Sequence, residues 1–395
     1  MAFETTKIAP KILWIIDIGT YKIRVGICKF HNCEMELLWY WEKRQNADDI
    51  VMHEFADLKN VCKNISLAIQ KAEEDAGIQI NDIVINIPFD EIFFQTSKIN
   101  YIRENHEKNI NKNELRKIIR ETEDIALKKH YKNIAQNSGY KKKDIRLIIG
   151  WVPEIKADKK KVKKLLDTNP ENINVSLLNI FIPENKYQII QSMSRFLWKN
   201  IKKIIPSEFA VTNLFKKKQD VVIIDLWSTQ TSIIVKKDNK ILWVRKHAFG
   251  IDSLIKNIRK NYNRTKIEII QTIDQDIYEP EKQEFLEIFE NILVISLEEI
   301  VWTDICPNDF FMMWWGSNKF IRKYLEKQNL NQNNLKIAKE INFVSPKIEY
   351  FENIDSSKSN LNIYALMLGT LSFIKNENDP IEESLKSALL EISET

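Results

Sequence analysis

The sequence predicts an α/β protein with two similar halves, each opening on a β-hairpin that is followed by a third strand. The main support is a repeated pattern of strand, aspartate, polar turn and strand, found at 11–30 and again at 221–235. Strands that alternate with helix-type apolar periodicity are typical of α/β folds. The length of 395 residues also exceeds what one small core organises, which favours two to four domains or subdomains.

The first half is expected to begin with KILWIIDIGTYKIRVGICKF, in which two β-rich runs flank a polar, Gly-containing turn. Apolar residues at helical spacing follow, and then a buried-type run of Ile and Val that ends before a proline. The predicted elements, in chain order, are strands at 12–16, 23–28 and 35–41, a helix over 57–76 and a strand at 83–87. A hairpin, a helix and a further strand make an α/β unit.

The composition changes between 81 and 170, where lysine and asparagine become more frequent. A helix is predicted at 112–129 and a strand at 145–149, and we interpret this stretch as an inserted subdomain. The first half then resumes, with a strand at 175–182 and helices at 187–201 and 207–215. The expected domains are a discontinuous first half of 1–80 and 171–215, the insert 81–170, a second half 216–375 and a tail helix within 376–395.

The second half is expected to repeat the opening of the first, with VVIIDLWSTQTSIIV in place of the first hairpin. After it, the predicted elements are a strand at 241–247, a helix at 251–260, an apolar run at 310–313 and a helix from Asn318. A short amphipathic helix is predicted at 381–392. Two degenerate copies of one unit, about 200 residues apart, are typical of an internally repeated fold.

The two polar turns are candidate phosphate sites. A β-hairpin turn of small residues offers several backbone N–H groups to an anion. An aspartate at the end of the first strand suits Mg²⁺ held through water, because Mg²⁺ keeps much of its hydration shell. Asp17 and Asp225 stand at these positions, and the candidate hydroxyl ligands are those of Thr20, Ser228, Thr229 and Thr231. One such turn alone is more often an ordinary hairpin, whereas two of them favour nucleotide binding.

These motifs resemble those of the actin-like ATPase superfamily over about residues 11–375. IDIGTYKIRVGI resembles its first phosphate loop, IDLWSTQTSIIV its second and FFMMWWGSNKF its adenosine motif. Within the superfamily the order of parts is most similar to FtsA, the cell-division protein, and next to PilM. HAFGIDSLIKNI resembles the FtsA segment after the second loop, and NKNELRKIIRETEDIAL with DIRLIIGWVP resembles the FtsA insert.

The resemblance implies two actin-like (ribonuclease-H-like) halves around a nucleotide cleft that binds ATP and Mg²⁺, together with an FtsA-type inserted subdomain. It assigns catalytic and, through water, metal-binding roles to Asp17 and Asp225. The implied cofactor-binding residues are Asp17, Gly19, Thr20, Lys22, Asp225, Trp227, Ser228, Thr229, Thr231, Gly250, Trp314, Trp315, Gly316 and Ser317.

The function implied is that of an ATP-binding cell-division protein. Such a protein self-associates into filaments, binds the tail peptide of an FtsZ-like division-ring protein and links the ring to the membrane. The alternatives are a PilM-like cytoplasmic scaffold of a pilus or secretion assembly and a nucleotide-free pseudo-ATPase scaffold. A sugar-kinase-type enzyme would need a catalytic Asp and a sugar pocket, and no segment of the sequence matches them.

Hydrolysis is expected to be weak at most. Many relatives carry an acidic residue before the proline of the segment that reads IIPSEFA here, and Ile205 stands at that position. Glu208 lies nearby but out of register, and we expect it on a helix surface. Without a carboxylate to position the attacking water, general-base catalysis loses its main group.

The balance of glycine and tryptophan is abnormal, with 8 Gly and 10 Trp. An average chain carries about 7% Gly, against about 2% here. Trp227, Trp314 and Trp315 stand where the family has glycine, as do Trp39 and Trp41. Either these residues are genuine and obstruct the site of a pseudo-ATPase, or the gene uses a code in which UGA means glycine. The abundance of Lys, Asn and Ile, which have AT-rich codons, fits the second interpretation.

Other function classes find little support. The net charge of +4 comes without basic residues clustered among aromatics, so no nucleic-acid binding is expected. No apolar run approaches the length of a membrane helix, and no signal peptide is evident, which predicts a cytoplasmic protein. The tail carries more Glu than Lys, so attachment to the inner face of the membrane stays open. Neither the 4 Cys nor the 5 His have metal-ligand spacing, and the cysteines are expected to be reduced thiols.

Overall fold

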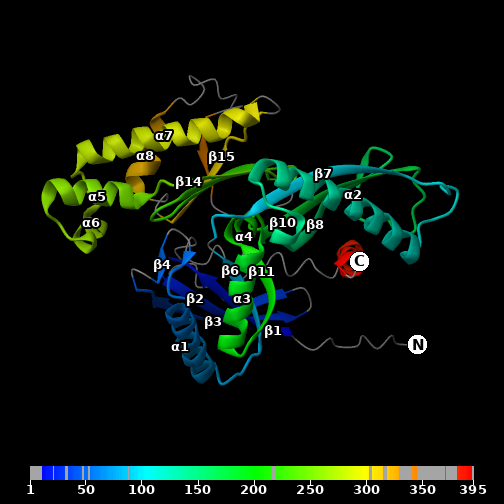
Figure 1. Cartoon of the computed structure of the whole chain (residues 1–395). Coiled ribbons are helices and arrows are strands. Elements are labelled where there is room, and N and C mark those ends of the chain that lie inside the picture. The colour runs from blue at the N-terminus through cyan, green and yellow to red at the C-terminus, as the bar shows by residue number, and fades with distance from the viewer. Residues whose placement is uncertain are drawn as a thin grey trace. The chain divides into compact units, whose positions relative to one another are not determined.

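The computed structural model divides the chain into two compact units, coloured along the chain in Figure 1. Unit 1 comprises Met1–Asn213, Ile348–Ser357 and Leu366–Thr395, and unit 2 comprises Leu214–Lys347 and Lys358–Ala365. The structure describes residues 11–20, 22–31, 34–46, 49–51, 54–87, 89–215, 219–301, 305–314, 318–328, 340–344, 370 and 380–393.

The first sheet of unit 1 has five strands in the order β11-β6-β1-β2-β3. Its strands are β1 (Lys11–Ile18), β2 (Lys22–His31), β3 (Glu34–Arg44), β6 (Asp82–Ile87) and β11 (Asn200–Pro206). The first three strands form an antiparallel meander, and β6 and β11 run parallel to β1. The helices of this part are α1 (Leu58–Ala76), α3 (Glu184–Leu197) and α4 (Ser207–Thr212), and β4 (Ile50–Val51) pairs with β5 (Glu54–Phe55).

Helix α1 shows why the sequence folds this way locally. Asp57 caps its first turn by accepting a hydrogen bond from the Asn60 N–H at 2.9 Å, which satisfies one of the amides that a helix start leaves unpaired. The helix ends at Gly77, whose φ of 65° is left-handed and suits glycine. Its buried face includes Val61 and Ile65, which join the core beneath the first sheet.

The second sheet of unit 1 has the order β7-β10-β8-β9 and is antiparallel throughout. It is built from β7 (Phe93–Ile102), β8 (Ile145–Ala157), β9 (Lys160–Val162) and β10 (Asn172–Pro183), with helix α2 (Lys112–Ser138) and the 3₁₀ turn η1 (Lys142–Asp144) between them. Strand β6 belongs to the first sheet and β10 to the second, so the inserted sheet extends from Phe93 to Pro183 rather than over 81–170. The physical reason is that both edges of β10 pair within the insert.

The C-terminal helix α10 (Pro380–Ser393) packs against α2 and β8, as the red helix in Figure 1 shows. Leu385 is 1% exposed and Ala388 3%, and Leu385 shares a core with Ile118 and Ile173. The apolar face predicted for this helix therefore lies on the inserted sheet, although Leu390 stays 66% exposed. Among the residues that the structure describes, no helix is both long and apolar enough to cross a membrane.

Unit 2 has one five-stranded sheet in the order β14-β13-β12-β15-β16. Its strands are β12 (Val221–Leu226), β13 (Thr231–Lys237), β14 (Lys240–His247), β15 (Asp309–Trp314) and β16 (Asn342–Phe343). Its helices are α5 (Ile251–Tyr262), α6 (Lys266–Thr272), α7 (Glu279–Val301) and α8 (Lys319–Lys327). In both sheets the aspartate-bearing strand lies between its antiparallel hairpin partner and a parallel strand, which confirms the repeated topology.

Candidate functional site

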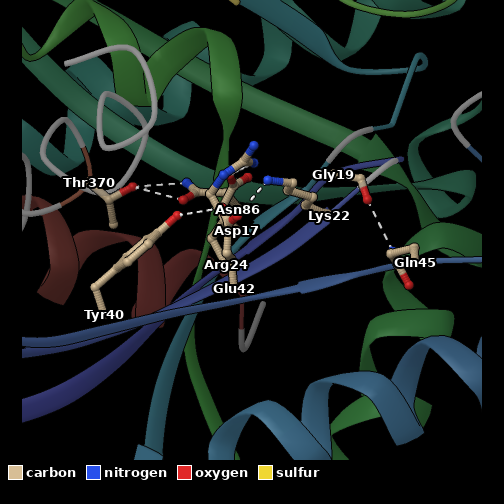
Figure 2. Close-up of polar contacts among 9 residues, drawn as sticks. All are labelled: Asp17, Gly19, Lys22, Arg24, Tyr40, Glu42, Gln45, Asn86 and Thr370. Carbon is tan, nitrogen blue, oxygen red and sulfur yellow. Dashed lines mark hydrogen bonds and ion pairs between the residues drawn. The ribbon is translucent and has the colours of Figure 1, made fainter. Parts of the chain in front are cut away.

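The first polar turn lies between β1 and β2 at the carboxyl end of β1. The Gly19 N–H donates to the Lys22 carbonyl at 3.0 Å and closes the turn. The Gln45 amide donates to the Gly19 carbonyl at 3.0 Å and holds the turn from β3's end (Figure 2). Thr20, a predicted ligand, lies at the tip of the turn and is half-buried.

Asp17 is buried beneath this turn, with 1% of its surface exposed. Arg24 is its cross-strand partner on β2, and the guanidinium Nη1 donates to Asp17 Oδ2 at 3.0 Å (Figure 2). Burial raises the pKa of Asp17, and the charge and hydrogen bond of Arg24 counteract part of this rise. Asp17 Oδ1 is buried without a hydrogen-bond partner in the described part of the chain, so this oxygen is available to a bound group.

Asn86 extends the polar site to the neighbouring parallel strand β6, where it is paired with Asp17. Its amide nitrogen donates to the Ile205 carbonyl at 3.2 Å and to Thr370 Oγ1 at 2.8 Å (Figure 2). Asp17 and Asn86 thus lie near the carboxyl ends of two parallel strands. That edge is where open α/β sheets bind their ligands.

Lys22, a predicted phosphate ligand, forms an ion pair with Glu42 on β3. The Tyr40 hydroxyl also donates to Glu42, at 3.1 Å to Oε2. Burial opposes ionisation of Glu42, but the hydrogen bond and charge of Lys22 hold its pKa below the ordinary value. Lys22 is about one-third exposed, so its ammonium can reach a ligand only by sharing it with this carboxylate.

The second polar turn, between β12 and β13, repeats the first in unit 2. The Trp227 N–H donates to the Gln230 carbonyl at 2.8 Å, which is the closure that Gly19 makes with Lys22. Asp225, 1% exposed, occupies the next-to-last position of β12, as Asp17 does in β1. The predicted pair of aspartate-bearing turns is therefore present in the structure, one in each unit.

Helix α5 begins directly against the second turn. The amides of Ile251 and Asp252 donate to the carbonyls of Trp227 and Ser228, at 3.0 and 2.8 Å. A Cβ on Gly250 would lie 2.4 Å from the Ser228 carbonyl oxygen, so no larger residue fits there without moving backbone. Gly250 has an extended φ of −153°, and its requirement is therefore space rather than conformation.

The other predicted residues of unit 2 lie around this turn. Thr231 is fully buried and donates its hydroxyl to the Phe249 carbonyl at 2.6 Å, which ties the hairpin to the segment before α5. Ser228 and Thr229 are half-buried. Trp314 ends β15 opposite Leu226, so the predicted adenosine motif starts beside the turn. Trp315, Gly316 and Ser317 lie outside the described residues.

The expectation for Glu208 was wrong. This carboxylate is 5% exposed and not on a helix surface, because all six residues of the short helix α4 are buried. Ile205, at the position where an acidic residue was sought, is fully buried in β11. The nearest carboxylate on this segment is therefore an interior one.

Sequence reasoning missed Arg24, Gln45 and Asn86. Arg24 had a usable indication, since Asp17 and Arg24 lie at matching distances from the turn of one hairpin. The other two approach the turn from remote segments.

The donor set fits Mg²⁺ only through water. In the described part of the chain no three His, Cys, Asp or Glu side chains gather into a metal-binding group. Asp17 Oδ1 offers one carboxylate oxygen, and Mg²⁺ is commonly bound by one or two carboxylates, several waters and substrate phosphates. The cysteines Cys28, Cys62 and Cys306 are free and buried, as expected for reduced thiols.

No family model and no curated protein matches this sequence. Among solved structures, the chain is similar to the protein of the "PilM-PilN type IV pilus biogenesis complex", with a TM-score of 0.62 and 12% identity over 91% of this chain and 97% of that one. EutJ from Carboxydothermus hydrogenoformans matches with a TM-score of 0.48 and 11% identity, over 93% and 92% of the two chains. A Bacteroides thetaiotaomicron protein with an actin-like ATPase fold gives 0.39 and 8%, over 93% and 98%.

At these identities the similarity establishes the fold alone. Its structural neighbours are proteins of the actin-like ATPase fold, as the motifs implied. PilM, the second family in the sequence comparison, is the one that appears among them. The comparisons lend no support to a role in cell division.

Proposed function

We propose that this protein is a nucleotide-binding scaffold that acts through a protein partner, in the manner of the PilM component of a pilus or secretion assembly. The observation that carries the proposal is the repeated turn with a buried aspartate at its base, of which Asp17 keeps an oxygen without a partner among the described residues. A buried carboxylate is costly to desolvate unless something compensates it. A hydrated Mg²⁺ with nucleotide phosphates supplies that compensation, and the backbone of each turn supplies N–H donors.

In this proposal ATP serves mainly as a conformational ligand. Mg²⁺ would neutralise phosphate charge, while Asp17 and Asp225 hold its waters and Lys22 contacts a phosphate. Ile205 occupies the position from which a carboxylate would orient water, and turnover is therefore slow. A ligand that prefers one of two conformations shifts the protein toward it without any need for hydrolysis.

The experiment is a titration of the full chain with Mg-ATP by calorimetry. Asp17→Asn and Asp225→Asn should each weaken binding by about tenfold or more, the cost of one charge-assisted contact. Asp238→Asn, in the exposed turn between β13 and β14, is the matched control and should leave binding unchanged. Equal binding by all four proteins would refute the role of the turns, and no binding by the parent chain would favour a nucleotide-free scaffold.

The partner separates the pilus assignment from the division assignment that the motifs first implied. A PilM-like scaffold is expected to capture a short peptide of a membrane partner of a PilN-like kind. An FtsA-like protein would instead capture the tail peptide of an FtsZ-like ring protein and sediment as filaments with ATP. Binding of the two peptides to the full chain, with sedimentation as a second readout, decides between them.

A further inference from the structure

We infer that the positions printed as tryptophan in this chain are glycine positions, and that the natural protein carries glycine there from UGA codons. The inference rests on backbone geometry and on comparison of the chain with itself, and does not depend on nucleotide binding. Eight of the ten tryptophans have a described backbone, namely Trp14, Trp39, Trp41, Trp151, Trp198, Trp227, Trp243 and Trp314.

The two aspartate turns give the first comparison. Gly19 and Trp227 each stand two residues after the buried aspartate, and each donates its N–H to the carbonyl three residues on, at 3.0 and 2.8 Å. The position that closes the turn is therefore glycine in one unit and tryptophan in the other. The Trp227 carbonyl also lies 2.5 Å from where a Cβ on Gly250 would be, so the turn is packed tightly against backbone.

The two sheets give the second comparison. Trp39 on β3 pairs with Ile27 next to a β-bulge, and Trp243 on β14 pairs with Val235 next to a β-bulge. Ile27 and Val235 follow Asp17 and Asp225 at the same separation, so the two tryptophans occupy equivalent places. Trp151 on β8 borders a third bulge. Glycine inside a strand commonly marks such bulges, whereas three independent bulges beside tryptophan have no packing reason.

Helix ends give the third comparison. Helices α1 and α2 end at Gly77 and Gly139, with φ of 65° and 77°. Helix α3 ends at Trp198, with a φ of 53° in the same left-handed region. Trp198 is 89% exposed, so no burial of its indole offsets the left-handed conformation. A residue with a Cβ is strained there by about 1–2 kcal/mol, and glycine is not.

Buried indoles supply a separate observation. Trp14 is fully buried in β1, and its indole Nε1 has no hydrogen-bond partner among the described residues. The buried Nε1 of Trp243 is in the same condition. A buried indole N–H usually finds an acceptor, because an unmet donor costs free energy. Replacement of the tryptophans by glycine also moves the chain, which has 8 Gly, toward the usual content of about 7%.

The consequence for the turn is local. With glycine at 227 the second turn would match the first, and a ligand could approach its backbone without an indole beside it. The obstructed site expected for genuine tryptophans would then not exist in the natural protein. An opened turn makes the inference relevant to the proposed nucleotide site, although its tests do not use nucleotide.

The first test reads the codons behind the ten tryptophans and the masses of peptides from the protein made in its native cell. UGA at these codons, with native peptides of glycine mass at 198 and 227, is the expected result. UGG codons at Trp39, Trp198, Trp227 and Trp243, or native peptides with tryptophan mass, would overturn the inference.

The second test measures thermal unfolding of the recombinant chain as printed. Trp198→Gly should raise Tm by about 2–4 °C, the shift that about 1 kcal/mol produces in a domain of this size. Gly77→Trp places an indole at a helix end of similar φ with open space around it, and should lower Tm by a similar amount. A Tm that falls or stays constant in Trp198→Gly would show that the indole belongs there and would overturn the geometric argument.

Discussion

Asp17 and Arg24 face each other as a directly paired couple across the first hairpin, with the guanidinium nitrogen 3.0 Å from the carboxylate oxygen. Both side chains are nearly inaccessible, at 1% and 9% exposure. Loss of one partner from such a pair leaves a buried charge uncompensated, which costs more than the pair itself contributes. Arg24→Ala should therefore lower the free energy of unfolding by about 3–5 kcal/mol, measured by urea denaturation.

Two further variants make this prediction specific. Lys63→Ala, at an exposed position of α1, should change stability by less than about 0.5 kcal/mol. The double variant Asp17→Asn with Arg24→Met should be less destabilised than Arg24→Ala alone, because it leaves no buried charge. If the double variant is the least stable of the three, the pair contributes net stability rather than mutual compensation.

Gly250→Ala tests the contact between the second turn and the start of α5. Its Cβ would meet backbone of Ser228 at 2.4 Å, and backbone cannot give way as a flexible side chain can. We expect a loss of about 1–3 kcal/mol in stability and a weakening of Mg-ATP binding by about tenfold as the turn shifts. Calorimetry and thermal unfolding of the same preparation measure both.

Gly150→Ala is the control for that variant. Its Cβ would meet Leu389 Cδ1 at 2.8 Å, which is the end of a flexible side chain on α10. The side chain can rotate away, so stability should fall by less and nucleotide affinity should not change. Equal losses of affinity in the two variants would mean that the Gly250 effect is not local to the turn.

Glu123 on α2 predicts a dependence of stability on pH. The side chain is fully buried and accepts a hydrogen bond from Asn179 at 2.5 Å, and burial raises its pKa to about 7. The folded chain therefore binds a proton that the unfolded chain releases near 4.5, and this group destabilises the fold progressively between pH 4.5 and 7. Glu123→Gln should thus match the parent protein in Tm at pH 4.5 and exceed it above pH 7.

Two comparisons isolate that effect. His130, also on α2, is buried with its pKa lowered to about 4, and its loss of stability on acidification has the opposite sign. Because His130 is present in both proteins, the difference in Tm between them reports Glu123 alone. Glu121→Gln changes an exposed carboxylate of the same helix and should leave the pH profile unchanged. A constant difference across the pH range would mean that Glu123 ionises normally in the folded chain.

Leu385→Ala tests the packing of the C-terminal helix. Leu385 is 1% exposed within the core of the inserted sheet, and truncation of such a leucine costs about 2–5 kcal/mol. Leu390→Ala, at a position 66% exposed on the same helix, should cost almost nothing. Hydrogen exchange of α10 amides measures the release of the helix directly, and equal protection in the two variants would contradict the packing described.

Local pattern predicted much of this structure, because hairpins and amphipathic helices leave their period in the sequence. The strands around Asp17 and Asp225, helix α1 and strand β15 all lie where the apolar runs placed them. The order of strands in the two sheets followed from the repeat rather than from any single segment.

What could not be predicted depends on contacts between remote segments. The hydrogen bond from Asn86 to Thr370 joins residues 284 positions apart, and no local pattern announces it. Strand β10 was assigned to the first half because its sequence is compatible with either sheet, and its partners β7 and β8 decide the matter. Glu208 was expected in solvent because a charged residue on a short helix usually is, whereas α4 is buried on every side.

Unit 1 is completed by the last part of the chain to be synthesised. Helix α10 supplies Leu385 to the core of the inserted sheet, and Thr370 caps Asn86 beside the first turn. While the chain is still emerging from the ribosome, most of unit 1 has been made but both places stay incomplete. The ribosome must therefore finish unit 2 before the first unit can reach its final packing, and a premature stop near the end of the gene would damage the part of the protein that was translated first.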